Sequence, residues 1–143
     1  MLSHKLIAHC KTKGWWFDAP IEDYRQPLLD LGVAPDSDFM RFFLHVEDCP
    51  TFRSQNVEMF QVGWFLTYSS YEDTIRATHE MGLPEQYLPL DDFQSERGFF
   101  YNRSTGEVLE LEAGPLLEQF LAGEVTPQWP DFNAFLEWYF ELS

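Results

Sequence analysis

Residues 96–112 read ERGFFYNRSTGEVLELE, and this stretch decides the fold class. The aromatic run at 99–102 and the Val, Leu and Glu residues at 107–111 each have the composition of a β-strand. Between them lies the polar segment 103–106, which ends in a glycine that can take a positive φ. The stretch therefore predicts a β-hairpin whose second strand carries glutamates.

Two segments upstream of the hairpin also have strand composition. Residues 87–90 form a short apolar run, YLPL. Residues 57–68, VEMFQVGWFLTY, are rich in aromatic and branched side chains and predict one or two strands, with Gly63 marking a bulge or a tight turn. Together with the hairpin, these segments predict a sheet built between residues 57 and 111.

Helical spacing dominates the first third of the chain. Apolar residues recur every three or four positions within residues 2–13, and Gly14 is placed to end that helix. A second helical segment can begin after a cap at Asp18 and run to residue 32. Pro27 lies inside it, and its ring would clash with the carbonyl one turn earlier, so this segment should kink or divide into two short pieces.

Three later helices have clearer starts. Asp36 or Ser37 precedes a helix over residues 39–46, and Asp131 precedes a closing helix. Ser70 and Asp73 have the spacing of a capping box and predict a helix that ends near residue 82. The apolar stripes of the first and last of these helices should face the core. The side chains expected to be largely buried are Phe39, Phe42, Phe43, Phe132, Leu136 and Phe140.

Helices first, strands in the middle and a helix last indicate a single α+β domain over residues 1–143, with residues 1–17 as an N-terminal helical extension. Hydrophobic residues make up 45% of the chain and aromatic residues 17%, which excludes intrinsic disorder. Two cysteines are too few for a disulfide framework, and no apolar run is long enough to span a bilayer. The N-terminal stretch lacks the apolar core of a signal peptide, so we expect a cytoplasmic protein.

The charge of the chain is strongly negative and unevenly distributed. Twenty-four Asp and Glu residues against nine Lys and Arg give a formal net charge of −15, and no Lys or Arg follows Arg103. Such a surface repels nucleic acid and anionic membranes and attracts basic partners. The alternative is that the charge only keeps an aromatic-rich domain in solution.

Metal-ligating and nucleophilic residues are present but lack a specific spacing. His45 and Cys49 could share a helix face and bind zinc, and Cys49 could pair with His79 as nucleophile and base. Neither pair belongs to a CxxC or HExxH motif. The simpler interpretation makes His45 a helix-surface residue and Cys49 a small buried hydrophobe.

Pairs of neighbouring carboxylates could bind a hard cation or act in acid–base chemistry. Asp36 and Asp38 also suit a helix N-terminus, and Asp91 and Asp92 follow a strand, where we expect them to face solvent. In a chain so rich in carboxylates, adjacent pairs arise by chance. The sequence therefore predicts no catalytic residue, no bound metal and no cofactor.

The order of these segments resembles the SUKH superfamily, which contains fungal cell-wall synthesis regulators and bacterial toxin-immunity proteins. The resemblance covers residues 21–140 and lies in pattern. The matching pieces are Leu31-Gly32-Val33, the helix at 35–46, Ser-Tyr-Glu-Asp at 70–73, the strand at 87–90, Thr-Gly-Glu-Val at 105–108 and Phe-x-x-Phe-Leu at 132–136. Two features depart from it: Pro27 interrupts the first helix, and residues 46–50 read VEDCP where the family often has Asn-Gly.

The resemblance implies a SUKH-like domain: a mixed, mostly antiparallel sheet flanked by helices, which serves as a non-catalytic scaffold for binding proteins. In bacteria such a domain is commonly an immunity protein that neutralises a secreted polymorphic toxin. The negative charge suits a basic toxin, and a basic nuclease is one candidate, because opposite charges speed association. Two other function classes stay open, an intracellular regulatory adaptor of the SUKH type and an enzyme with an unrecognised pocket.

Carboxylates near the hairpin should give one side of the molecule a strong negative potential and receive the basic partner. An aromatic side chain, Phe93 or Trp129, would supply the desolvated anchor that charge alone cannot. Trp129 could instead be buried as a staple before the last helix. The predicted partner-binding residues are Asp91, Asp92, Phe93, Glu96, Glu107, Glu110, Glu112 and Trp129.

Overall fold

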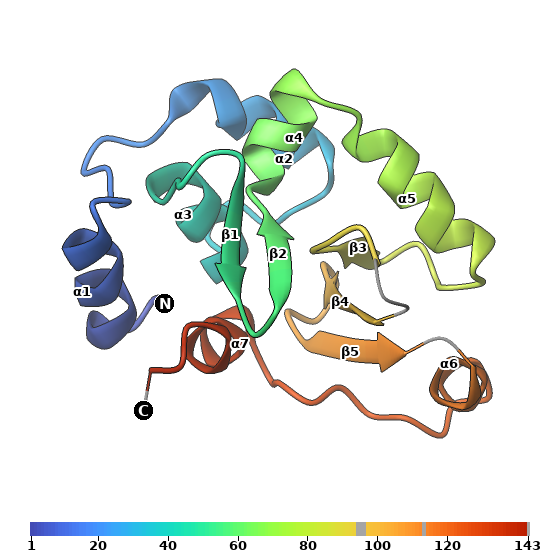
Figure 1. Ribbon diagram of the computed structural model, residues 1–143. Coiled ribbons are helices and arrows are strands. Elements are labelled where there is room, and N and C mark those ends of the chain that lie inside the picture. The colour runs from blue at the N-terminus through green and yellow to red at the C-terminus, as the bar shows by residue number, and fades with distance from the viewer. Residues whose placement is uncertain (94–96, 113, 143) are drawn as a thin grey trace.

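The computed structural model describes residues 1–93, 97–112 and 114–142. Helices form most of the first half and the C-terminal end, and strands occupy the middle of the chain (Figure 1). This order confirms the α+β class predicted from the sequence.

Five strands within the described residues form two antiparallel sheets. β1 (Thr51–Ser54) pairs with β2 (Val57–Phe60). In the other sheet, β4 (Arg97–Asn102) lies between β3 (Tyr87–Pro89) and β5 (Val108–Glu112). The strands thus form two antiparallel sheets, where one mixed, mostly antiparallel sheet was expected.

The hairpin predicted over residues 96–112 is present as β4 and β5. Gly106 has a φ of 86°, and its N–H donates to the Asn102 carbonyl at 2.7 Å. The Asn102 side chain closes the turn further, because its Oδ1 accepts from the backbone N–H of Ser104 at 2.9 Å and of Thr105 at 3.2 Å. The turn residues therefore fix the register of the hairpin, as the glycine and the polar side chains indicated.

The prediction of strand structure throughout residues 57–68 is wrong. The chain leaves β2 at Phe60 and forms a helix, α4 (Val62–Tyr68). Gln61 starts this helix, since its Oε1 accepts from the Trp64 N–H at 3.2 Å. Gly63 lies inside the helix, where an added Cβ would be 2.6 Å from the Tyr24 ring, so the glycine permits close packing and marks no bulge.

Strand β1 was not expected from the sequence. It is only four residues long, and its connection to β2 is a two-residue turn in which Gln55 and Asn56 have φ angles of 52° and 58°. Positive φ at both central residues is typical of the type I′ turn that closes tight hairpins. The usual signal for this turn is a glycine, and the Gln-Asn pair does not supply it.

The remaining helices follow the predictions in most respects. α1 (His4–Lys13) ends at Gly14, and the segment around Pro27 divides into a short 3-10 helix (Glu22–Tyr24) and α2 (Arg25–Asp30). Asp18 does not cap this segment, because its carboxylate accepts instead from the Trp16 indole N–H at 3.0 Å.

α3 (Asp38–His45) and α7 (Phe132–Tyr139) begin at the predicted caps, Ser37 and Asp131. α5 (Tyr71–Glu80) is present where it was expected, although the Ser70 side chain makes no capping hydrogen bond. α6 (Pro115–Leu121) was not predicted. No helix of the described ranges has the length and apolar character that crossing a bilayer requires.

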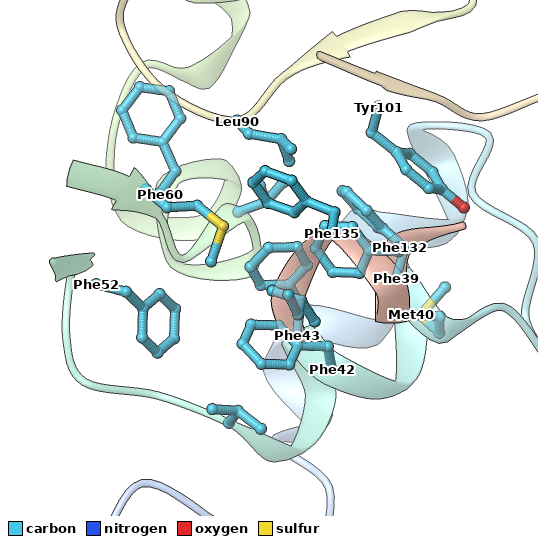
Figure 2. Packing of buried hydrophobic residues seen from close by; sticks show 14 of the residues in the cluster. Phe39, Met40, Phe42, Phe43, Phe52, Phe60, Leu90, Tyr101, Phe132 and Phe135 are labelled. Atoms are coloured by element: carbon cyan, nitrogen blue, oxygen red, sulfur yellow. The ribbon is translucent and has the colours of Figure 1, made fainter. Parts of the chain in front are cut away.

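The core lies where α3 and α7 meet the sheets, and phenylalanines fill it (Figure 2). Phe39 stacks on Tyr101 of β4 with ring centroids 4.3 Å apart and lies 5.1 Å from the Phe132 ring. Offset and edge-to-face contacts of this kind add to the free energy of burying the rings. All six side chains predicted to be buried are in this core: Phe39, Phe42, Phe43, Phe132, Leu136 and Phe140.

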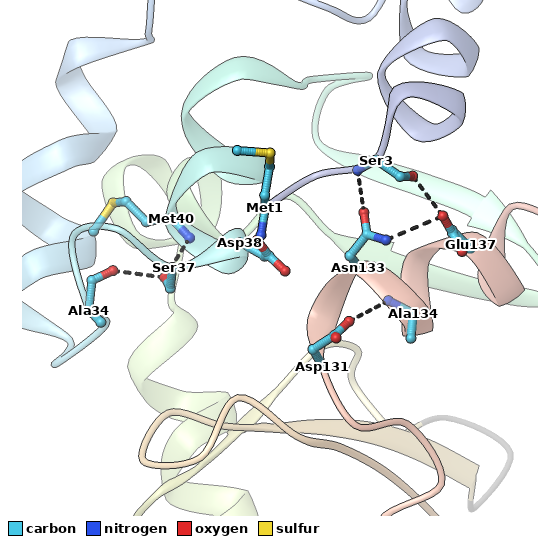
Figure 3. A network of polar contacts seen from close by, with 10 residues as sticks. All are labelled: Met1, Ser3, Ala34, Ser37, Asp38, Met40, Asp131, Asn133, Ala134 and Glu137. Carbon is cyan, nitrogen blue, oxygen red and sulfur yellow. Dashed lines mark hydrogen bonds and ion pairs between the residues drawn. The ribbon is translucent and has the colours of Figure 1, made fainter.

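The N-terminal segment packs on this body (Figure 3). The Ser3 N–H donates to Asn133 Oδ1 at 2.8 Å, and its hydroxyl donates to Glu137 at 2.6 Å, so both groups hold the segment to α7. Leu6 and Cys10 are fully buried in the core. Residues 1–17, expected as a helical extension, thus contribute core side chains and are fastened by polar contacts.

One residue, Leu90, joins the two sheets. Its carbonyl accepts from the Phe60 N–H of β2 at 2.8 Å, and its own N–H donates to the Phe99 carbonyl of β4 at 2.9 Å. β2 and the end of β3 therefore lie side by side (Figure 1). Beyond Leu90, Asp91 and Asp92 line an open cleft together with residues of β2.

Candidate functional site

The cleft lies between β2, the start of α5 and the chain that follows β3, and its volume is about 680 Å³. Among the residues that the structure describes, four carboxylates and one guanidinium line it, together with hydroxyl and aromatic side chains. The charged residues are Glu58, Asp73, Asp91, Asp92 and Arg97, and among the others are Ser69, Ser70, Thr74, Phe60 and Phe65. We call this site the acidic cleft.

The wall formed by β2 presents backbone groups as well as side chains. The Phe60 N–H reaches Leu90 and so points away from β1. Backbone groups of alternate residues in an antiparallel strand point to the same side, so the N–H and C=O of Glu58 also point away from β1. Glu58 lines the acidic cleft, which places this edge of β2 along it.

The opposite wall is held by α5. Tyr71 is buried in the first turn of that helix, and its hydroxyl donates to the Pro89 carbonyl of β3 at 2.6 Å. This bond fixes the start of α5 beside the end of β3. Because Asp73 and Thr74 follow on the same first turn, both side chains are placed at the cleft.

Asp91 is the buried acid of the cleft, with an exposed fraction of only 3%. Its Oδ1 accepts from the Phe93 N–H at 2.9 Å. Its Oδ2 is also buried and has no hydrogen-bond partner among the described residues. The sequence led us to expect a solvent-facing Asp91, and this expectation is wrong because the neighbouring Leu90 is bonded on both sides and carries the next residue inward.

Burial raises the pKa of Asp91 from 3.8 to about 7, since the ionised form loses hydration. Hydrogen bonding from the backbone N–H groups of Phe93 and Phe99 and the charge of Arg97 act in the opposite direction, and the charge of Asp92 adds to the rise. A buried carboxyl without a full set of partners is costly to ionise. At neutral pH this group is therefore divided between its protonated and ionised forms.

Arg97 supplies the positive charge of the cleft, but another carboxylate already engages it. Its Nε donates to Glu110 of β5, and its guanidinium lies 5.3 Å from the centroid of the Phe99 ring. Both residues of this ion pair are partly buried, with side-chain exposed fractions of 33% and 21%. The carboxylates of the cleft consequently exceed the charge available to balance them.

Two of these carboxylates form ion pairs at the surface. Glu58 lies 2.6 Å from Arg53, and Asp73 lies 3.0 Å from Arg76. All four side chains are more than half exposed, so water and salt screen both pairs and each contributes little free energy. A cationic ligand could displace these arginines at small cost.

Tight packing fixes the turn that carries Asp91. Phe93 has a φ of 58°, which is unfavourable for a side chain with a Cβ. Its ring packs over Gly98 of β4, where a Cβ would lie 2.3 Å from the ring and 2.9 Å from Asp91 Oδ1. Gly98 therefore creates the space that holds Asp91 and Phe93 together.

The predicted partner-binding residues do not form one face. Asp92 is exposed at the cleft and Phe93 is half-buried against Phe100. Glu110 pairs with Arg97, and Glu112 is opposite Arg97 in the register of the hairpin, so both lie at its open end. Glu107 lies at the turn, the other end of the hairpin, and Glu96 is outside the described residues.

Trp129 acts as a staple. Its backbone exchanges two hydrogen bonds with Val108, at 3.0 Å and 3.2 Å, and its indole packs on Phe135 and Trp138 with centroids 5.1 Å and 4.9 Å away. The preceding Gln128 continues this pairing, because its side-chain amide accepts from the Glu110 N–H at 2.9 Å and donates to the Glu110 carbonyl at 3.1 Å. Segment 128–129 thus covers the outer edge of β5.

The alternative reactive residues lie in other environments. His45 stacks on Trp16 and contacts the Phe17 carbonyl through Nδ1 at 2.7 Å. Cys49 is exposed, which corrects the expectation that it would be buried. Partial loss of hydration, together with the negative charges of Glu47 and Asp48, raises the pKa of its thiol. Raising that pKa lowers the thiolate fraction and hence the reactivity of this cysteine.

Across the described ranges, no three His, Cys, Asp or Glu side chains are grouped closely enough to hold a metal ion. The four carboxylates of the acidic cleft are therefore spread along its walls. Asp38, another member of the acidic pairs considered above, forms an ion pair with the N-terminal amine of Met1.

Comparisons with family models, with curated proteins and with solved structures find no significant match to this chain.

Sequence reasoning found Asp91 and Asp92 but missed the rest of the acidic cleft. Glu58 and Asp73 come from different elements, and no spacing in the chain relates them to Asp91. Only the packing of β2, α5 and the end of β3 brings them together. The one available hint was that Asp91 directly follows the apolar run at 87–90, which is buried.

Proposed function

We propose that this protein is a non-catalytic, acidic protein-binding domain whose partner is basic. The observation that carries the proposal is the acidic cleft, in which four carboxylates face an arginine that Glu110 already engages. The net charge of −15 supports it, because a negative field accelerates the encounter with a positive protein.

In its more specific form, the proposal is that the domain is an immunity protein of the SUKH type that neutralises a secreted polymorphic toxin. The order of segments over residues 21–140 supports this form, as does the charge, which suits a basic toxin such as a nuclease. An intracellular regulatory adaptor of the same type is the alternative within this class. Both use the domain as a stoichiometric binder.

Co-expression tests the proposal. The domain is produced together with the product of the neighbouring gene, and cell growth and co-purification are measured. We expect a one-to-one complex with a basic protein and growth that depends on the presence of the domain. A neighbouring product that is toxic regardless of the domain, together with no basic protein retained on the immobilised domain at low salt, would rule out the immunity function.

A second candidate function is supported by one observation, the pKa of about 7 for Asp91 within a polar cleft. A carboxyl that titrates near neutrality can act as a general acid or base. The two candidates differ in what Asp91→Asn removes. If the domain is an enzyme, the variant loses turnover while the partner stays bound; if it is a binder, the variant weakens the complex.

A further inference from the structure

We propose that Asp91 is the receptor for one arginine side chain of the basic partner, which enters the acidic cleft and pairs with the buried carboxylate. This inference rests on the proposed function and deepens it, because it names the group of the partner that the cleft recognises.

The free acceptor is Asp91 Oδ2. It is buried and makes no hydrogen bond of normal geometry among the described residues, whereas Oδ1 accepts from the Phe93 N–H and the Phe99 backbone N–H also favours the ionised carboxyl. Buried polar atoms without partners are rare in native proteins and call for an explanation. Asp91 lines the acidic cleft, and because Oδ2 is itself buried, its side chain must turn toward the cleft for a donor there to reach it.

The chemistry of the ligand is that of an organic cation. A metal ion would need several carboxylates converging on one point, and no such group exists in the described part of the chain. A single buried carboxylate with further acids spread along the approach is suited to a long side chain that carries its charge at the end. Arginine and lysine are the two side chains of this kind.

The walls favour arginine over lysine. The half-buried Phe65 lines the cleft, with its ring packed on the buried Phe60 at a centroid distance of 4.4 Å, and its exposed part offers a surface on which a planar guanidinium can stack. Ser69, Ser70 and Thr74 place hydroxyl groups at the same cleft. Guanidinium has five donors in a fixed plane, so it can bond to Asp91 and to these oxygens together, whereas the more strongly hydrated ammonium cannot stack in this way.

Proton linkage gives the inference a distinctive signature. The charged and titratable groups around Asp91 are Asp92, Arg97, Glu58 and Asp73 at the cleft and Tyr139 of α7. Because burial keeps Asp91 partly protonated at neutral pH, a guanidinium must bind the ionised form and displace the proton. Affinity should therefore rise as the pH rises through the pKa of about 7.

The experiment uses two short, extended peptides with blocked ends, identical except that one has a central arginine and the other citrulline, its neutral isostere. Binding to the isotope-labelled domain is followed by NMR, through the amide signals of Phe60 and Leu90 and the carboxyl signal of Asp91. The domain is compared with Asp91→Asn and with Glu80→Gln, a matched control that removes an exposed carboxylate at the far end of α5.

We expect the arginine peptide to shift the signals at the cleft and the citrulline peptide to leave them unchanged. Affinity for the arginine peptide should increase about tenfold between about pH 6 and about pH 8. Asp91→Asn should weaken binding by about thirtyfold or more at the higher pH and remove the pH dependence, because it takes away the charged acceptor. Glu80→Gln should retain both the affinity and the pH dependence.

Equal binding of the arginine and citrulline peptides, shifts elsewhere on the domain, no binding at all, or an unchanged affinity of Asp91→Asn would each overturn the inference. The same variants are then tested on the co-purified partner. If that complex is lost on reversal of exposed carboxylates but unaffected by Asp91→Asn, the partner is basic and the arginine receptor is wrong. If no basic partner is found, the proposed function itself fails.

Discussion

Asp91 and Asp92 are adjacent carboxylates that the fold treats differently. Both lie in the turn that follows β3, where no strand alternation decides which side chain faces inward. The structure places Asp91 at 3% exposure and leaves Asp92 exposed. The sequence showed the pair but not which of the two is buried, because that depends on how Leu90 is bonded to β2 and β4.

Asp91 should make the stability of the domain depend on pH. Between the ordinary carboxyl pKa of 3.8 and the folded-state value of about 7, the folded protein holds a proton that the unfolded chain has released. The free energy of unfolding should therefore fall as the pH rises through this range, by up to about 4 kcal/mol. Urea unfolding of the wild-type domain and of Asp91→Asn at several pH values measures this.

The difference between the wild-type domain and Asp91→Asn reports on Asp91 alone, since the other carboxylates titrate in both proteins. As the pH rises, the wild-type domain should lose stability relative to Asp91→Asn, and the difference between their free energies of unfolding should level off above about pH 8. Stability curves that run parallel across this range would show that Asp91 has no raised pKa.

Gly98 should tolerate no side chain. A Cβ at this position would lie 2.3 Å from the Phe93 ring, so Gly98→Ala should destabilise the domain by about 1–3 kcal/mol through overpacking. Adding Phe93→Ala should recover part of this loss, because removal of the ring frees the space for the new methyl group. Thermal and urea unfolding of both single variants and the double variant measure the coupling; strictly additive effects would contradict it.

At the scale of elements, α4 shows how tertiary contacts decide local structure. Its residues, VGWFLTY, have strand-like composition, and the sequence predicted a strand. Gln61 is fully buried and donates to the carbonyls of Phe43 and Val46 at 3.1 Å and 2.7 Å, while its Oε1 caps the helix. These partners belong to the end of α3, and no local pattern announces them.

Removal of the Gln61 side chain should therefore lower the free energy of unfolding by more than the loss of a helix cap alone would. Gln61→Ala uncaps α4 and leaves two buried carbonyls without this donor, for an expected loss of about 2–4 kcal/mol. Thr67→Ala is the matched control, because Thr67 is an exposed residue whose hydroxyl donates to the Gly63 carbonyl within the same helix at 2.8 Å. Urea unfolding measures both variants, and equal losses would show that Gln61 has no special role.

The elements that the sequence did predict share strong local signals. The turn chemistry of Asn102 and Gly106 defined the β4–β5 hairpin, and capping residues with wide apolar stripes defined α3 and α7. β1 and α6 are four and seven residues long and have neither kind of signal. The acidic cleft was hidden for a related reason, since its residues converge only when β2, α5 and the end of β3 pack together.

At the scale of the whole molecule, the negative charge is distributed unevenly. Arg97 is paired with Glu110, and Arg103 donates to the Leu31 carbonyl, so two cations near the hairpin are already engaged. The predicted residues that stay at the open end of the hairpin and the cleft are Asp92 and Glu112, both exposed. If the proposed basic partner approaches this side, these two charges guide it.

Charge reversal tests this guidance. Asp92→Lys combined with Glu112→Lys should slow association with a basic partner and flatten its salt dependence, with a smaller effect on dissociation. Asp23→Lys combined with Glu80→Lys changes the net charge equally at exposed positions outside the cleft and should slow association less. Stopped-flow or surface-binding kinetics at several salt concentrations measure the rates. Equal slowing by both double variants would show that only the net charge matters.

At high protein concentration an open sheet edge promotes aggregation, because the edges of two molecules can pair. In this molecule, Gln128 imitates a backbone peptide: its amide exchanges two hydrogen bonds with Glu110, beside the pair that Trp129 makes with Val108. The outer edge of β5 is thereby closed by a segment that is not itself a strand. Gln128→Pro should reopen that edge and promote self-association, which light scattering against concentration would detect, while the wild-type domain should remain dispersed.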